Sequence, residues 1–138
     1  MLQLLLALSL SIAPPNYAAL VNDYYPVSAD DDSLWFVERD SVVEGRGNSR
    51  TNKVWVRSLD REDMSDSTVL MTVDCVAEKS RTTFIRIEYF ERDEVVTASE
   101  PGEWIPFVPG SHMAAIGKLV CGDALPTDWA NPTFFAGG

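Results

Sequence analysis

A run of prolines and glycines constrains the backbone of this chain more than any other feature. Residues 101–110, which we call the collar, contain three prolines and two glycines. Because proline lacks an amide hydrogen and fixes φ, we expect no regular structure up to Gly110. Ser111 follows, and a serine there can accept a hydrogen bond from an unpaired amide of a helix's first turn. The sequence therefore predicts an irregular collar and a helix that begins at Ser111.

The predicted helix covers residues 111–121 and has one apolar stripe. Met113, Ile116, Gly117 and Val120 recur at the spacing of a buried helical face. We therefore expect this helix to lie across a layer of other secondary structure.

Before the collar, short segments of alternating polarity are separated by polar turns, which is typical of an antiparallel sheet. In residues 53–59, for example, Val54 and Val56 point to one face and Trp55 and Arg57 to the other. The predicted strands are residues 25–29, 34–39, 53–59, 68–77, 81–91 and 94–98. The acidic run at 30–32 is interpreted as a hairpin turn, and residues 60–67 as a solvated connection. The expected fold is α+β: a single antiparallel sheet of about six strands with one C-terminal helix packed on it.

The chain has two cysteines, Cys75 and Cys121. The first is predicted on the apolar face of a strand and the second at the end of the apolar helical stripe. A cysteine metal site would need more ligands nearby than one histidine supplies. An even cysteine count in an exported chain favours a disulfide, which would join the helix to the sheet.

The N-terminal segment has the pattern of a secretory leader. Residues 2–12 are almost wholly apolar, and two prolines and small residues follow. The usual basic start and a regular cleavage motif are missing, so a short buried helix or a retained anchor stays an alternative. We expect residues 1–19 to be a signal peptide, 20–121 the domain and 122–138 an irregular tail, with the mature protein exported and without a membrane span.

Composition excludes several classes of function. The chain has 11 basic and 21 acidic residues and therefore a net charge of −10, which disfavours nucleic-acid binding. Common nucleotide, zinc-protease and redox motifs are absent, so we expect no cofactor and no metal. His112 is the single histidine, and its neighbour Ser111 points elsewhere on the helix. We therefore expect an exposed His112 and no enzyme activity.

Two exposed surfaces are the candidate binding sites. The glycine-rich loop 45–50 carries Arg46 and Arg50 in an otherwise acidic chain. Trp104 lies in the collar between prolines, and tryptophan is enriched at protein recognition sites. Loops on a rigid scaffold commonly carry binding residues, so Arg46, Arg50 and Trp104 are the predicted contacts.

The chain contains a series of short motifs: Leu34-Trp35-Phe36-Val37, Asp40-Ser41-Val42, Val54-Trp55-Val56, Val73-Asp74-Cys75, Pro101-Gly102-Glu103-Trp104, Pro109-Gly110-Ser111 and Val120-Cys121. Together these motifs resemble the surface-adhesin protein E family of small exported bacterial proteins. The resemblance implies an antiparallel sheet of about six strands, a C-terminal helix against it and a cysteine bridge. It also implies adhesion, in which a surface-exposed member binds host extracellular-matrix and serum proteins.

The sequence thus predicts a non-enzymatic, exported binding module of the bacterial envelope, in the periplasm or at the cell surface. Its expected partner is a protein, from the extracellular matrix or the envelope, and a homodimer is compatible with the pattern. A periplasmic assembly factor that pairs through a sheet edge is the first alternative. A small hydrolase centred on His112 is the second.

Overall fold

The computed structural model describes residue 20 and residues 22–122. The predicted signal peptide and nearly all of the predicted tail lie outside these residues. Among these residues, none of the helices has both the length and the hydropathy that a membrane span requires.

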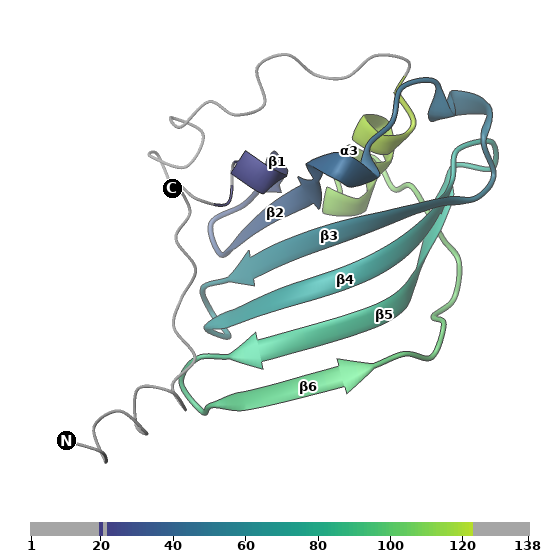
Figure 1. Ribbon diagram of the computed structural model, residues 1–138. Helices are drawn as coiled ribbons and strands as arrows, with labels where there is room; N and C mark the ends of the chain where they lie inside the picture. Colours follow the sequence, from purple (N-terminus) through teal and green to yellow (C-terminus); the bar gives the residue numbers. More distant parts are fainter. Residues whose placement is uncertain (1–19, 21, 123–138) are drawn as a thin grey trace.

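The fold is an antiparallel sheet in which six strands follow one another in chain order (Figure 1). The strands are β1 (Tyr24–Ala29), β2 (Ser33–Glu38), β3 (Asn52–Asp60), β4 (Ser65–Asp74), β5 (Lys79–Tyr89) and β6 (Glu94–Ala98). A seventh short strand, β7 (Ile105–Pro106), pairs with the start of β5. The helix α3 (His112–Val120) comes after it. This arrangement confirms the predicted α+β class.

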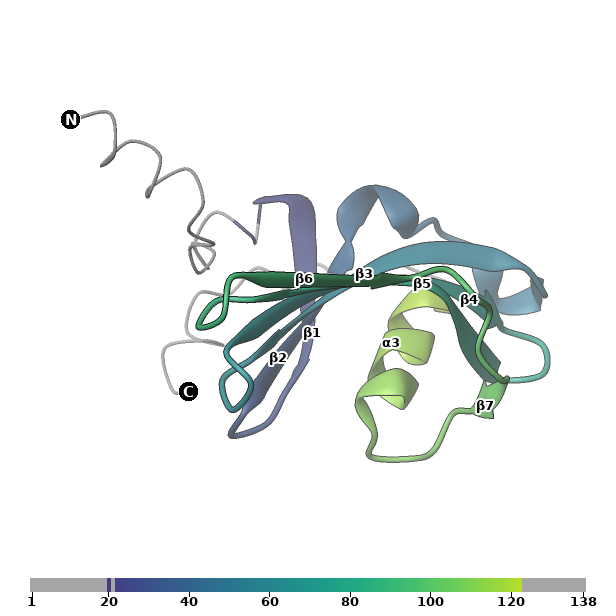
Figure 2. The same ribbon diagram turned by 90° about the horizontal axis from the view of Figure 1, so that it is seen from below.

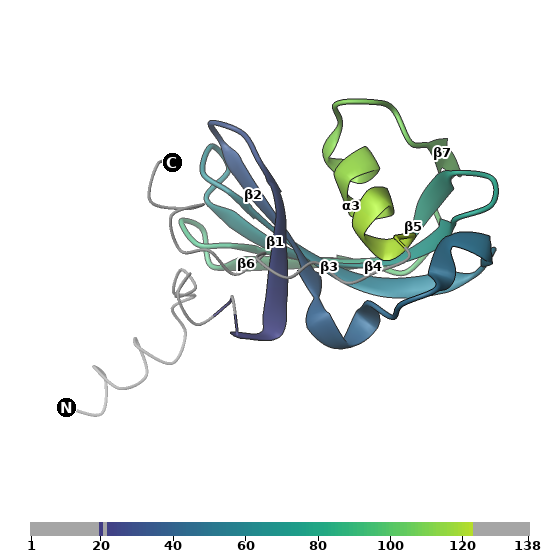
Figure 3. The ribbon, with the colours of Figure 1, turned by 90° about the horizontal axis from the view of Figure 1, so that it is seen from above.

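The sheet curls around α3, which packs on one of its faces (Figures 2 and 3). We call this face the inner face and the opposite one the outer face. Ile116 and Val120 are fully buried there against Val54, Val56 and other inner-face residues. The stripe is wider than predicted, because Leu119 is buried as well.

The helix begins where the sequence predicted. Ser111 Oγ accepts a hydrogen bond from the amide of Ala114 at 3.1 Å, which makes Ser111 the N-cap. At the other end, Cys121 forms the predicted disulfide with Cys75, with the two Cα atoms 5.5 Å apart. Cys75 lies one residue past the end of β4, so the bond joins the C-terminal end of α3 to the end of a central strand of the sheet.

The predicted bounds of the fourth strand, 68–77, are wrong. Residues 61–64 form a tight turn in which Met64 has a positive φ of 51°, so β4 begins at Ser65. At the other end, Asp74 Oδ1 accepts from the amides of Val76 and Ala77 and turns the chain out of the strand. Polar Asp66, assigned to a solvated connection, is instead buried in the sheet.

The prediction that the collar has no regular structure is also corrected. Two of its amides bond to β5 and to the residue before it. Gly102 donates to the carbonyl of Thr82 at 2.8 Å, and Phe107 donates to that of Glu78 at 2.9 Å. Pro106 is tolerated because β7 is a short edge strand. The collar therefore covers the first half of β5, while β6 covers the second half.

Candidate functional site

Trp104 is held on the outer face by two cations from β5. The Arg81 guanidinium lies 4.8 Å from the centre of the Trp104 ring, and the Lys79 ammonium lies 5.0 Å from it. Cations over an aromatic face attract its negative quadrupole. The indole keeps 36% of its surface exposed. The collar thus presents an oriented aromatic platform with two positive charges beside it.

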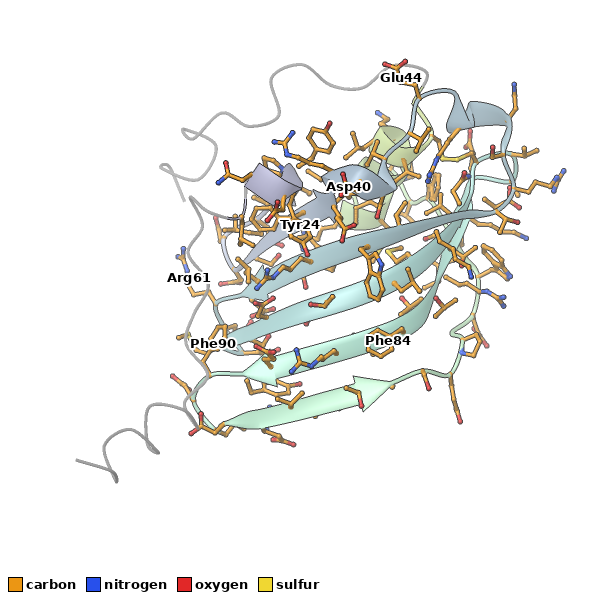
Figure 4. All side chains as sticks on the ribbon, in the orientation of Figure 1. Tyr24, Asp40, Glu44, Arg61, Phe84 and Phe90 are labelled. Carbon is orange, nitrogen blue, oxygen red and sulfur yellow. A yellow bond between two sulfur atoms is a disulfide. The ribbon has the colours of Figure 1, made fainter. Side chains whose placement is uncertain are left out.

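Cross-strand pairing extends this surface over the outer face. Lys53, Thr72 and Arg81 form one row across β3, β4 and β5. The adjacent row contains Trp55, Leu70 and Phe84, in which the Trp55 and Phe84 rings meet edge to face at 6.0 Å. Phe84 lies on the side turned away from α3 (Figure 4).

Two further cations of the outer face are already paired with carboxylates. Arg57 donates from Nε to Asp66 Oδ1 at 2.9 Å, and this hydrogen bonding raises the pKa of the arginine. Arg86 lies 2.6 Å from Glu88. By contrast, Lys53, Lys79 and Arg81 form no ion pair with any residue that the structure describes. We call these three cations together with Trp104 the basic–aromatic corner.

The structure places the predicted binding residues in two groups: Trp104 in the basic–aromatic corner, and Arg46 and Arg50 in the loop 45–50. Arg50 is 69% exposed and lies 3.8 Å from Asp74. Arg46 is half-buried in the short helical turn η2 (Arg46–Asn48). The loop reaches the end of the sheet through the Ser49 carbonyl, which accepts from the amide of Cys75.

Sequence reasoning singled out Trp104 but missed the cations that contact it. Lys79 and Arg81 lie more than 20 positions earlier in the chain, and only the pairing of the collar with β5 brings them to the indole. A strand that carries two basic residues two positions apart, with both on one face, is the signal that was present.

A second polar cluster lies at the start of α3 and corrects the prediction for His112. The side chain of His112 is only 26% exposed and bridges two residues of the β1–β2 hairpin. Ser28 Oγ lies 2.7 Å from its Nδ1, and Asp30 Oδ2 lies 2.9 Å from its Nε2. Ser111 does not bond to His112, as expected, and its hydroxyl instead donates to the carbonyl of Val108.

A network around the cluster fixes its geometry. The Trp35 ring stacks on His112 with centroids 5.0 Å apart and planes 19° apart. Trp35 Nε1 donates to Ser33 Oγ, and Ser33 Oγ donates to Asp30 Oδ1. The amides of Asp32 and Ser33 also donate to Asp30 Oδ1. These contacts, led by the amide of Asp32 and followed by His112, hold the pKa of Asp30 well below its ordinary value.

A hollow of about 780 Å³ runs along α3 beside this cluster. Ser28 lines it together with small and apolar residues, which include Phe107, Ala114, Ala115 and Gly117, and with the charged residues Glu78 and Lys118. The disulfide cysteines line it as well.

The described part of the chain contains no group of three His, Cys, Asp or Glu side chains that could hold a metal ion. Comparisons of the sequence with protein-family models, of the chain with curated proteins, and of the fold with solved structures found no match. The resemblance to the surface-adhesin protein E family therefore rests on the quoted motifs alone and stays a prediction.

Proposed function

We propose that this protein is an exported binding module that takes an acidic segment of a partner protein on its basic–aromatic corner. The observation that carries the proposal is the Trp104 ring in contact with Arg81 and Lys79. A tryptophan oriented by neighbouring groups loses little conformational freedom when it binds. The Arg81 side chain makes no hydrogen bond to a described residue. Its Nε is buried, so its two terminal nitrogens are the donors that can pair with a carboxylate in a bidentate manner.

Charge distribution supports a protein partner. The chain carries a net charge of −10, whereas the corner gathers three cations without an ion pair among the described residues. A nucleic acid would be repelled by the rest of the surface, because its phosphates extend well beyond one local patch. A short acidic peptide segment can contact the corner alone.

The test is binding to immobilised peptides of defined sequence. One peptide alternates Glu with Tyr, and its control carries Gln in place of Glu. We expect the protein to bind the first more tightly and to lose at least about 30-fold in affinity when Lys79, Arg81 and Trp104 are replaced by Ala in what we call the corner variant. A loss of about 30-fold corresponds to one interface hot spot.

The matched control removes Arg86 and Arg92, which are already paired with Glu88 and Glu94. This variant has lost two cations and should bind almost as well as the wild type. A third variant, Arg46→Ala with Arg50→Ala, tests the loop that the sequence predicted. Equal losses in the control and the corner variant would reduce the effect to net charge and overturn the proposed site.

The partner and cellular location proposed here are those that the motifs suggest: an extracellular-matrix or envelope protein, met in the periplasm or at the cell surface. Cell fractionation with N-terminal sequencing of the recovered protein tests export and cleavage near residue 19. Binding of matrix proteins to the wild type but not to the corner variant would support an adhesin role.

One observation favours a second candidate function, assembly through a sheet edge. All five residues of β6 are exposed, including Val95 and Val96, and among the described strands only β5 pairs with β6. An exposed edge can accept another strand. If the protein assembles in this way, replacing Val96 by Pro should abolish dimers seen by sedimentation, whereas the corner variant should keep them.

A further inference from the structure

We propose that Ser28, His112 and Asp30 form an acyl-transfer site that hydrolyses small esters. Ser28 comes from β1, Asp30 from the turn after it and His112 from the first position of α3. The two hydrogen bonds of 2.7 and 2.9 Å connect serine, histidine and aspartate in one chain. Ser111, which neighbours His112 in sequence, does not contact its ring, whereas Ser28, 84 positions away, lies within hydrogen-bonding distance of it.

The connections define the proton positions that catalysis needs. Asp30 is a carboxylate and can only accept, so Nε2 of a neutral His112 carries the proton and donates to it. His112 Nδ1 then has a free lone pair and accepts from the Ser28 hydroxyl. This assigns Ser28 as nucleophile, His112 as general base and Asp30 as a positioning residue. In the more common arrangement Nε2 contacts the serine and Nδ1 contacts the aspartate, and here the two nitrogens are exchanged. Either nitrogen of imidazole can transfer a proton.

The reaction follows from these positions. Ser28 Oγ bonds to the ester carbonyl carbon while its proton moves to His112 Nδ1. The tetrahedral adduct then loses the alcohol, which takes that proton. Water attacks the acyl-serine and gives a proton to Nδ1, and the proton returns to Ser28 Oγ as the carboxylic acid leaves. The sum is ester plus water to acid plus alcohol.

The surroundings indicate the substrate class. The part of the hollow bordered by Phe107, Ala114 and Ala115 suits a short apolar acyl group, while Glu78 and Lys118 line other parts of it. At the start of α3, the amides of His112 and Met113 make no hydrogen bond to a described residue. These donors lie in the same turn as the base and are of the kind that stabilises an oxyanion.

The network behind the cluster gives it rigidity. Trp35 stacks on the His112 ring and, through Ser33, fixes the carboxylate of Asp30. Catalytic groups need such support, because small displacements cost large factors in rate. If these residues only connected α3 to the hairpin, the contact between His112 and Asp30 would be sufficient. The hydroxyl of Ser28 would then not be needed.

The test is covalent labelling of the purified, oxidised protein with an ethyl fluorophosphonate, followed by peptide mass spectrometry. We expect one adduct per chain, on Ser28, and slow hydrolysis of p-nitrophenyl acetate that the adduct blocks. Ser28→Ala should lose the adduct. His112→Gln should lower the labelling rate by about 100-fold, the usual contribution of a general base.

Asp30→Asn separates positioning from folding. It should lower the maximal labelling rate constant by about tenfold or more, with the half-saturating reagent concentration and circular dichroism unchanged. Asp31→Asn and Ser99→Ala, which lie outside the network, are the matched controls and should label like the wild type. The corner variant should also label normally, so this proposal and the binding proposal fail independently.

Labelling of the wild-type chain requires no variant to fold. If Ser28 carries no adduct, or if His112→Gln labels as fast as the wild type, the proposal is overturned and the three residues only connect α3 to the hairpin.

Discussion

The Phe107 ring packs directly on Gly117, so a methyl group built at this glycine would lie 2.5 Å from a ring carbon. Gly117 thus lets the collar approach α3. Alanine there would raise helix propensity by about 1 kcal/mol, but overpacking costs about 1–3 kcal/mol. We expect Gly117→Ala to lower the free energy of unfolding in urea.

The ring itself provides the control for this prediction. In a Phe107→Ala background the clash is absent, so the same Gly117→Ala change should raise stability. If Gly117→Ala has the same sign in both backgrounds, the close packing of Phe107 on α3 is wrong.

Loss of the disulfide should strongly lower the free energy of unfolding. Cys75 and Cys121 are 46 positions apart, and closing a loop of this length restrains the unfolded chain by about 4 kcal/mol. Replacing both cysteines by Ser should lower the free energy of unfolding by up to about this amount. Thiol labelling of the denatured, unreduced wild type should find no free cysteine in the described chain. Stoichiometric labelling of two thiols would contradict the bond.

The contacts of Asp30 predict an acid-sensitive hairpin. Because the folded pKa of Asp30 lies below its ordinary value of 3.8, its stabilisation is complete above that value and declines as the pH falls below it. Asp30→Asn should therefore be less stable than wild type in urea at about pH 5, and the difference should shrink at about pH 2.5. Asp31→Asn is the matched control. If the stability difference between Asp30→Asn and the wild type is the same at both pH values, the ionisation of Asp30 is not its source.

Most of the fold could be predicted because its signals are local. The Ser111 cap and the apolar stripe define α3, and period-2 alternation locates β3, β5 and β6. The errors arise where a distant partner changes the meaning of a residue. Asp66 looks solvated in the sequence, yet Arg57 on the neighbouring strand neutralises it inside the sheet.

The candidate sites could be predicted only in part for the same reason. Trp104 is conspicuous in the sequence, but its cations come from β5, which the collar reaches by hydrogen bonds that no local pattern encodes. The Ser28–His112–Asp30 cluster joins residues 82 to 84 positions apart, and only the packing of α3 against β1 brings them together. Sequence reasoning correctly separated Ser111 from His112 but had no means to find Ser28.

The packing of α3 on the inner face brings these sites into place. Ile116 is fully buried between α3 and the inner face. Its replacement by Ala should lower the free energy of unfolding by about 2–5 kcal/mol, because it removes apolar contacts and leaves a cavity. Lys118→Ala is the matched control on the same helix, since Lys118 is exposed and should change stability by less than about 0.5 kcal/mol. Equal urea midpoints for Ile116→Ala and Lys118→Ala would mean that α3 does not pack on the sheet through this residue, and the positions of His112 and Phe107 would then be wrong as well.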